Sequence, residues 1–126
     1  SSFHAGPHFH EIRYQAFVVA ALGSIAGTSY TAAKGAIEAM TRTAAMEFAR
    51  YGITVNCVAP GIINTGMFQQ QPERARNHML DRTPMRRAGD PMEIAACYRF
   101  LSTRDASYVT GQTLYACGGV SVGDFR

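Results

Sequence analysis

The stretch Ile53-Thr54-Val55-Asn56-Cys57-Val58-Ala59-Pro60-Gly61 is the clearest strand-and-turn signal in this 126-residue chain. β-branched residues fill most of its first half, and their stiff side chains favour extended backbone. We therefore predict a strand over residues 53–58. Pro60 and Gly61 follow at once, and these two residue types are typical of a turn.

A long amphipathic helix is predicted just before this strand. Ser29 is placed to cap the helix at its start, and Gly52 is placed to end it. The expected helix runs from about Tyr30 to Arg50. Its apolar face shows the spacings of three and four that a helix requires, at Ala33, Ile37, Met40, Ala44 and Phe48.

Another strand is predicted upstream of this helix. Residues 17–22 are an unbroken apolar run that ends at Gly23, which suits a strand buried on both faces of a parallel sheet. Residues 1–16 are expected to be irregular, because Gly6 and Pro7 interrupt any regular period. No metal site is predicted there, although that segment holds His4, His8 and His10.

A second helix is predicted to start at the run Asp90-Pro91-Met92-Glu93. Asp90 can cap it, Pro91 suits the first helical position, and Glu93 can complete a capping box. Residues 64–89, which precede this helix, are polar and arginine-rich and are predicted to form a short helix with flexible flanks. The buried stripe of the second helix is expected at Ile94, Cys97, Tyr98 and Leu101.

The remaining strand is predicted over residues 110–116, before Gly118 and Gly119 stop it. The order strand, helix, strand, helix, strand is typical of a parallel α/β sheet with helical crossovers. We therefore expect one α/β domain over residues 17–126.

Composition narrows the class of protein. The longest apolar run, residues 16–22, is far shorter than the roughly 20 residues that a membrane span needs. The spacing of the three cysteines fits neither a disulfide framework nor a metal site, so we expect reduced thiols in a cytoplasmic protein without a membrane anchor.

Much of the net charge of +3 lies in one arginine-rich stretch. A solvated surface is the plainest interpretation of such a run, and an acidic partner or a phosphate-bearing ligand is an alternative. No nucleic-acid partner is expected, because no aromatic interleaving or binding motif accompanies the arginines. The stretch contains Arg74, Arg76, Arg82, Arg86 and Arg87.

The chemistry is indicated by Tyr30-Thr31-Ala32-Ala33-Lys34. Residues four apart on a helix share one face, so Tyr30 and Lys34 are neighbours there. A free tyrosine has a pKa of about 10, and a nearby ammonium group lowers it. A phenol adjusted in this way can take a proton from an alcohol or give one to a carbonyl.

Four segments in this order resemble the short-chain dehydrogenase/reductase family over about residues 17–122. The first two are Gly23-Ser24-Ile25-Ala26-Gly27 with residues 30–37, and Val55-Asn56-Cys57-Val58-Ala59-Pro60-Gly61-Ile62-Ile63-Asn64-Thr65. The others are Gly89-Asp90-Pro91-Met92-Glu93-Ile94-Ala95, and Thr110-Gly111-Gln112-Thr113-Leu114 leading to Gly118-Gly119. The resemblance to members such as the 3-oxoacyl carrier-protein reductases implies an NAD(P)-dependent oxidoreductase.

The resemblance assigns catalytic roles by position. It implies that Tyr30 is the acid/base and that Lys34 lowers the pKa of Tyr30 and holds the nicotinamide ribose. Ser24 would hydrogen-bond the substrate oxygen. The substrate is expected to be a small-molecule alcohol or carbonyl compound.

The resemblance also implies a cofactor site for NAD or NADP. Pro60 and Gly61 would wall the nicotinamide ring. The backbone amide of Ile63 would bind the carboxamide, and the hydroxyl of Thr65 would lie near the phosphates. Asn56 is expected to support the turn structurally. Residues 66–89 are expected to form a mobile lid over the substrate. The protein is expected to be a homo-oligomer, either a dimer or a tetramer.

Two departures from the family pattern shape the remaining expectations. Ser24 and Tyr30 are six positions apart, where the family has about a dozen residues between them. The family's Gly-x-x-x-Gly-x-Gly phosphate turn was not found in residues 1–22, so we expect the C-terminal half of a Rossmann-like doubly wound parallel sheet, with the N-terminal half missing. A rival interpretation makes residues 23–29 the phosphate turn itself; it requires an acidic residue at the end of the next strand.

An alternative to the enzyme is a truncated fragment or pseudoenzyme. Such a chain would act through self-association or through association with full-length relatives, because half a sheet exposes an unpaired strand edge and an apolar face. A further hypothesis is that the arginine-rich stretch binds an acidic carrier.

Overall fold

The computed structural model describes residues 11–15 and 28–122. Its main elements are β1 (Glu11–Gln15), α2 (Thr28–Phe48), β2 (Thr54–Pro60), α3 (Gly66–Gln69), α4 (Glu73–Asp81), α5 (Pro91–Ser102) and β3 (Thr113–Ala116). Three single 3-10 turns, at Ala49–Tyr51, Arg104–Ala106 and Val120–Val122, complete it. Strands and long helices alternate, as the sequence predicted.

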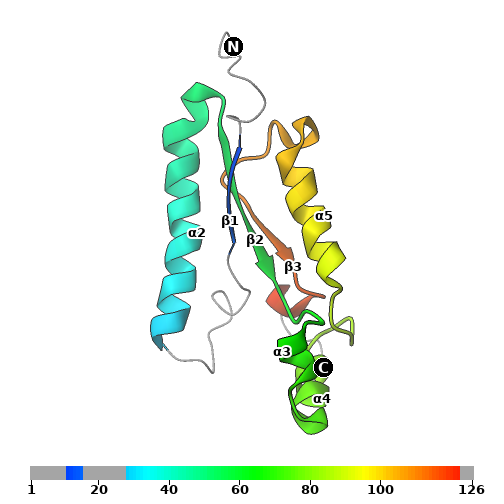
Figure 1. The fold of residues 1–126 in the computed structure, drawn as a ribbon. Coiled ribbons are helices and arrows are strands. Elements are labelled where there is room, and N and C mark those ends of the chain that lie inside the picture. Colours follow the sequence, from blue (N-terminus) through cyan, green and yellow to red (C-terminus); the bar gives the residue numbers. More distant parts are fainter. Residues whose placement is uncertain (1–10, 16–27, 123–126) are drawn as a thin grey trace.

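The three strands form one parallel sheet in the order β1-β2-β3. Figure 1 shows the sheet between α2 and α5, with one long helix on each side. Every residue of β2 is buried, because a central strand between two helices has no face open to water. The fold is therefore the expected partial doubly wound α/β sheet.

The strand β1 differs from the prediction of an irregular segment over residues 1–16. Glu11–Gln15 pair in parallel with β2, and Ile12 lies opposite Val55. Charged and polar residues occupy alternate positions of this short strand, so it lacks the continuous apolar run that favoured residues 17–22. That predicted strand lies outside the described residues, as do His4, His8 and His10.

The helix α2 confirms the predicted long helix, although its buried face is turned relative to the expected stripe. Thr41 and Ala45 are buried, with 0% and 3% of their surface exposed, whereas Met40 is 55% exposed. The Thr41 hydroxyl donates to the Ile37 carbonyl at 2.7 Å, so its burial leaves no polar atom unpaired. Ser29 lies inside the helix rather than at its cap.

The ends of both long helices follow local sequence signals. Gly52 adopts a left-handed conformation, with φ 73°, at the end of the 3-10 turn after α2. At the start of α5, the Asp90 carboxylate accepts from the Met92 N–H and the Glu93 carboxylate accepts from the Asp90 N–H, which confirms the predicted capping box.

The core on the α5 side of the sheet is small. Val58, Ile94, Leu101 and Ala106 form it, with Cys97 and Tyr98 packed against it, as the predicted stripe requires. The strand β3 starts at Thr113, three residues later than predicted, because Gly111 before it has a positive φ of 72° that ends extended pairing. Within the described ranges, none of the helices combines the length and hydropathy needed to cross a membrane.

Candidate active site at the carboxyl ends of the strands

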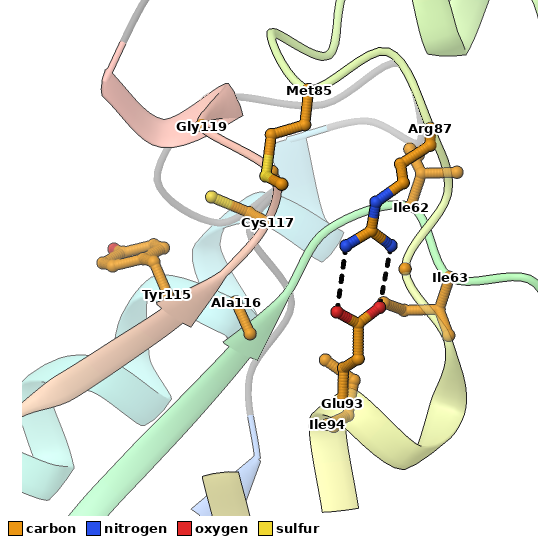
Figure 2. Close-up of a pocket in the computed structure, with 12 residues that line it drawn as sticks. Ile62, Ile63, Met85, Arg87, Glu93, Ile94, Tyr115, Ala116, Cys117 and Gly119 are labelled. Carbon is orange, nitrogen blue, oxygen red and sulfur yellow. Dashed lines mark hydrogen bonds and ion pairs between the residues drawn. The ribbon is translucent and has the colours of Figure 1, made fainter. Parts of the chain in front are cut away.

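A pocket of about 360 Å³ lies where β2 and β3 end. Open α/β sheets bind their ligands at this edge, beyond the carboxyl ends of the strands. Figure 2 shows the side chains that surround it, which come from three separate segments. The lining residues are Ile62, Ile63, Met85, Arg87, Gly89, Glu93, Ile94, Tyr115, Ala116, Cys117, Gly118 and Gly119.

Pro60 is the last residue of β2 and pairs with Ala116, rather than starting the predicted turn, and Gly61 after it packs tightly on the end of β3. The Gly61 N–H donates to the Ala116 carbonyl at 3.0 Å. A Cβ atom at position 61 would lie 2.7 Å from the Cα of Cys117. Only glycine fits at this position, and the close approach brings the segment after β2 against the pocket.

The segment after the turn is held by a short parallel bridge between Ile63 and Gly89. The Gly89 N–H donates to the Ile62 carbonyl, and the Asn64 N–H donates to the Gly89 carbonyl, both at 2.8 Å. The Ile63 N–H itself has no hydrogen-bond partner among the described residues. Ile63 is half-buried and lines the pocket.

Thr65 lies at the start of α3 with an exposed side chain. Its hydroxyl oxygen accepts from the Phe68 N–H at 3.4 Å. A hydroxyl that accepts one hydrogen bond can still donate its own proton. Thr65 therefore can donate to an anionic group beside the Pro60–Thr65 segment.

Tyr30 and Lys34 lie in the first two turns of α2. The helix runs back along the sheet from the carboxyl ends of the strands (Figure 1), so both positions belong to the edge that carries the pocket. One turn further along the same face, the Glu38 carboxylate accepts from the Tyr115 hydroxyl at 3.0 Å. This bond ties the face of α2 that carries Tyr30 and Lys34 to a pocket residue. The predicted partner Ser24 lies outside the described residues.

Tyr115 and Tyr98 both have perturbed phenol groups. Burial, followed by the hydrogen bond to Glu38, raises the pKa of Tyr115 to about 12. Burial likewise raises the pKa of Tyr98 to about 12. Both phenols therefore stay protonated near neutral pH.

Arg87 and Glu93 form a two-bond ion pair on the pocket wall (Figure 2). The hydrogen bond from Arg87, followed by that from the Asp90 N–H, lowers the pKa of Glu93 to about 2. The same contact raises the pKa of Arg87. The carboxylate therefore stays charged at neutral pH.

The arginine-rich stretch is divided over several elements. Arg74 and Arg76 lie on α4 and Arg82 follows it, whereas Arg86 and Arg87 belong to the loop before α5. Ion pairs with Asp81 and Glu93 neutralise Arg86 and Arg87. Binding of an acidic carrier by this stretch stays a prediction.

Asn56 has a structural role, as expected, but at a different place. Its side chain donates to the Val109 carbonyl at 3.0 Å and accepts from the Gln112 N–H at 3.2 Å. It therefore holds the approach to β3 rather than the Pro60–Gly61 turn.

Two other predictions concern ligands of different kinds. The rival phosphate-turn interpretation needs an acidic residue at the end of the next strand, but β2 contains none and ends at Pro60. In the part of the chain that the structure describes, no three His, Cys, Asp or Glu side chains gather as a metal site.

A parallel strand–helix series with a pocket at the carboxyl edge of the sheet defines a partial doubly wound α/β protein. The family model described as enoyl-(acyl carrier protein) reductase matches residues 12–121. With this match over most of its length, the chain belongs to the short-chain dehydrogenase/reductase family.

Curated relatives show the same relationship. The (2S)-((R)-hydroxy(phenyl)methyl)succinyl-CoA dehydrogenase subunit BbsD of Thauera aromatica is 47% identical over 101 residues, which are 80% of this chain and 41% of the relative. The 3-oxoacyl-(acyl-carrier-protein) reductase FabG of Thermotoga maritima is 43% identical over 83% of this chain and 43% of its own length. The dog (3R)-3-hydroxyacyl-CoA dehydrogenase is 36% identical over 82% of this chain and 40% of its own length. The chain thus spans about two fifths of the length of these relatives.

Sequence reasoning missed the contacts made by Tyr115 and by the Arg87–Glu93 pair. Glu38 and Tyr115 are 77 positions apart, so no local pattern connects them. The sequence placed Arg87 in the arginine-rich stretch and Glu93 in the capping box, but their pairing depends on the path of the loop between them.

Proposed function

We propose that this chain is the acid/base-bearing part of an NAD(P)-dependent oxidoreductase that acts on an alcohol or carbonyl compound. The observation that carries the proposal is the position of Tyr30 and Lys34. They lie on the face of α2 that Glu38 ties to the pocket residue Tyr115. This pair and the Pro60–Thr65 segment therefore share one edge of the sheet.

The described residues fit a nicotinamide cofactor at that edge. The Ile63 N–H, which has no partner among the described residues, suits a carboxamide oxygen, and the close-packed backbone at Pro60 and Gly61 suits a flat ring. Thr65 has a hydroxyl proton available for a phosphate. NAD or NADP would supply or accept the hydride when bound.

The proton moves through residues of the chain itself. In carbonyl reduction the Tyr30 hydroxyl gives its proton to the substrate oxygen, and in alcohol oxidation the phenolate takes it. The Lys34 ammonium favours that phenolate and holds the ribose. Ser24 donates a hydrogen bond to the substrate oxygen where negative charge develops.

The substrate is proposed as a small molecule with a hydroxyl or carbonyl group. Two of the relatives are named as a 3-oxoacyl-(acyl-carrier-protein) reductase and a (3R)-3-hydroxyacyl-CoA dehydrogenase, which supports oxoacyl and hydroxyacyl thioesters as first candidates. Residues 66–89, which include α3 and α4, would form the lid over such a substrate.

Replacement of the tyrosine hydroxyl tests this proposal. Tyr30→Phe should lower kcat by about a hundredfold or more, because the proton donor is gone, while the Kd of NADH or NADPH changes little. Tyr108→Phe is the matched control, since Tyr108 is fully exposed. Activity of Tyr30→Phe equal to that of the control would refute the role of Tyr30.

A non-catalytic fragment that acts by self-association is the alternative. Large apolar side chains are exposed on both long helices, among them Met46 on α2 and Phe100 on α5. Exposed apolar side chains favour association where they gather into patches. Light scattering should then find a dimer or tetramer, and an assay with NADH or NADPH should find no hydride transfer. A stable monomer would exclude the alternative.

A further inference from the structure

The side chains of Arg87 and Glu93 meet in an end-on geometry, through both terminal nitrogens of the guanidinium group. The Arg87 Nη1 donates to the Glu93 Oε1 at 2.8 Å, and the Nη2 donates to the Oε2 at 3.0 Å (Figure 2). Such paired bonds fix the orientation of both groups more strictly than a single contact does. Both side chains are about half exposed, at 51% and 49%, so the value of the pair lies in geometry more than in burial.

The same carboxylate also closes the start of α5. The Glu93 Oε1 accepts from the Asp90 N–H at 2.8 Å. Glu93 therefore links a rigid helix end to the loop that carries Arg87. Residues 88–90 are held between these two attachments.

Gly89 lies within that short span and touches the segment after β2. It exchanges backbone hydrogen bonds with Ile62 and Asn64. A Cβ atom at Gly89 would lie 3.0 Å from the Cδ1 of Ile63 and 3.9 Å from the Glu93 Oε1. The position of Ile63, and with it the direction of the Ile63 N–H, therefore depends on where Gly89 is held.

We propose that Arg87 and Glu93 are positioning residues, whose paired side chains hold Gly89 against residues 62–64 and so fix where Ile63 and its N–H lie at the pocket wall. The described contacts alone support the first, geometric half of the proposal, namely that the Arg87–Glu93 pair holds Gly89 and Ile63 in place. Its consequence for cofactor binding rests on the proposed function. The pair acts through the backbone and needs no contact with the ligand.

Hydrogen exchange in the ligand-free chain tests the geometric half. The Gly89 and Asn64 amide hydrogens should exchange about two- to tenfold faster in Arg87→Gln, because the loss of one exposed pair loosens the bridge locally. Glu93→Gln should show the same increase in exchange. The amide oxygen of the new glutamine can still accept from the Asp90 N–H, so the start of α5 keeps its cap. This variant therefore tests the proposal if Arg87→Gln folds poorly.

The neighbouring pair provides a matched control. Arg86→Gln breaks the somewhat more exposed contact between Arg86 and Asp81 but leaves the Gly89 bridge intact. The Gly111 amide, which donates to the Val55 carbonyl at 2.7 Å, reports on global opening and should not change in any variant. Equal exchange at Gly89 in wild type and Arg87→Gln, or an equal increase in Arg86→Gln, would overturn the proposal.

Titration with NADH and NADPH tests the consequence. Their Kd should rise about two- to tenfold in Arg87→Gln and Glu93→Gln and stay constant in Arg86→Gln. An unchanged Kd beside faster Gly89 exchange would overturn the role of the pair in cofactor binding. If the wild-type chain binds neither cofactor, the proposed function fails for this chain, while the exchange result still decides the geometric half.

Discussion

At the scale of single residues, Gly61 leaves the least room for a side chain at the site, because an added Cβ would lie 2.7 Å from the Cys117 Cα. Its neighbour is the backbone of Cys117, which no rotamer change can move aside. Gly61→Ala should lower the free energy of unfolding by about 1–3 kcal/mol through overpacking, as measured by urea denaturation.

Gly35 on α2 is the matched control, because no described heavy atom lies within 4 Å of an added Cβ there. Gly35→Ala should instead stabilise the chain by about 0.5–1 kcal/mol, since glycine is unfavourable inside a helix. Equal effects of the two substitutions would contradict the packing described for Gly61.

The ionisation of Glu93 makes the free energy of unfolding depend on pH in the acid range. The Arg87 hydrogen bond lowers the pKa of Glu93 from its ordinary value of 4.5 to about 2. A group with a lowered pKa stabilises the folded state above its unfolded pKa, and this contribution is lost as the pH falls through the folded pKa. The free energy of unfolding should therefore decrease between pH 4.5 and about 2, and this decrease should be smaller in Glu93→Gln. An identical pH profile for both proteins would exclude the contribution.

At the scale of elements, Asn56 joins the central strand to the approach of β3. Only 2% of its surface is exposed, and its amide satisfies two backbone groups, at Val109 and Gln112. Asn56→Ala should lower the free energy of unfolding by about 1–3 kcal/mol, because the Val109 carbonyl and the Gln112 N–H both lose a partly buried hydrogen-bond partner. Urea denaturation measures this, and Asn64→Ala, at an exposed asparagine, should change stability by less than about 0.5 kcal/mol. Similar losses in both variants would contradict the account of Asn56.

Elements with strong local signals could be predicted from the sequence. Gly52 ends the 3-10 turn that follows the first long helix, because it can adopt a positive φ. Asp90 and Glu93 start the second long helix, because their side chains satisfy free N–H groups. The strand β1 was missed because its five residues gain their order by pairing with β2, which no local pattern reveals.

The buried face of α2 differs from the predicted one for a related reason. A hydrophobicity pattern selects Met40 over Thr41, but the small Ala45 and the self-satisfied Thr41 allow the helix to approach the sheet closely. Gly111 marks this approach, since a Cβ there would lie 3.3 Å from the Ala45 Cβ. The segment Pro60–Thr65 was found through its motif, whereas the contacts that hold it required the three-dimensional structure.

At the scale of the whole molecule, the start of the long helix α2 and the pocket at the ends of β2 and β3 lie at the same edge of a parallel sheet (Figure 1). The chain spans about two fifths of the length of its relatives, and the described sheet has β1 and β3 as its two edges. Cofactor binding by this chain therefore depends on whether the segment after β2 and the first turns of α2 suffice, alone or in an assembly of several copies.

Titration of the purified 126-residue chain with NADH and NADPH, followed by nicotinamide fluorescence, tests this most directly. The proposed site predicts saturable binding in the micromolar range, with a lower affinity in Arg87→Gln. An absence of binding at millimolar concentrations of both cofactors would contradict the claim that this chain forms a working nicotinamide site.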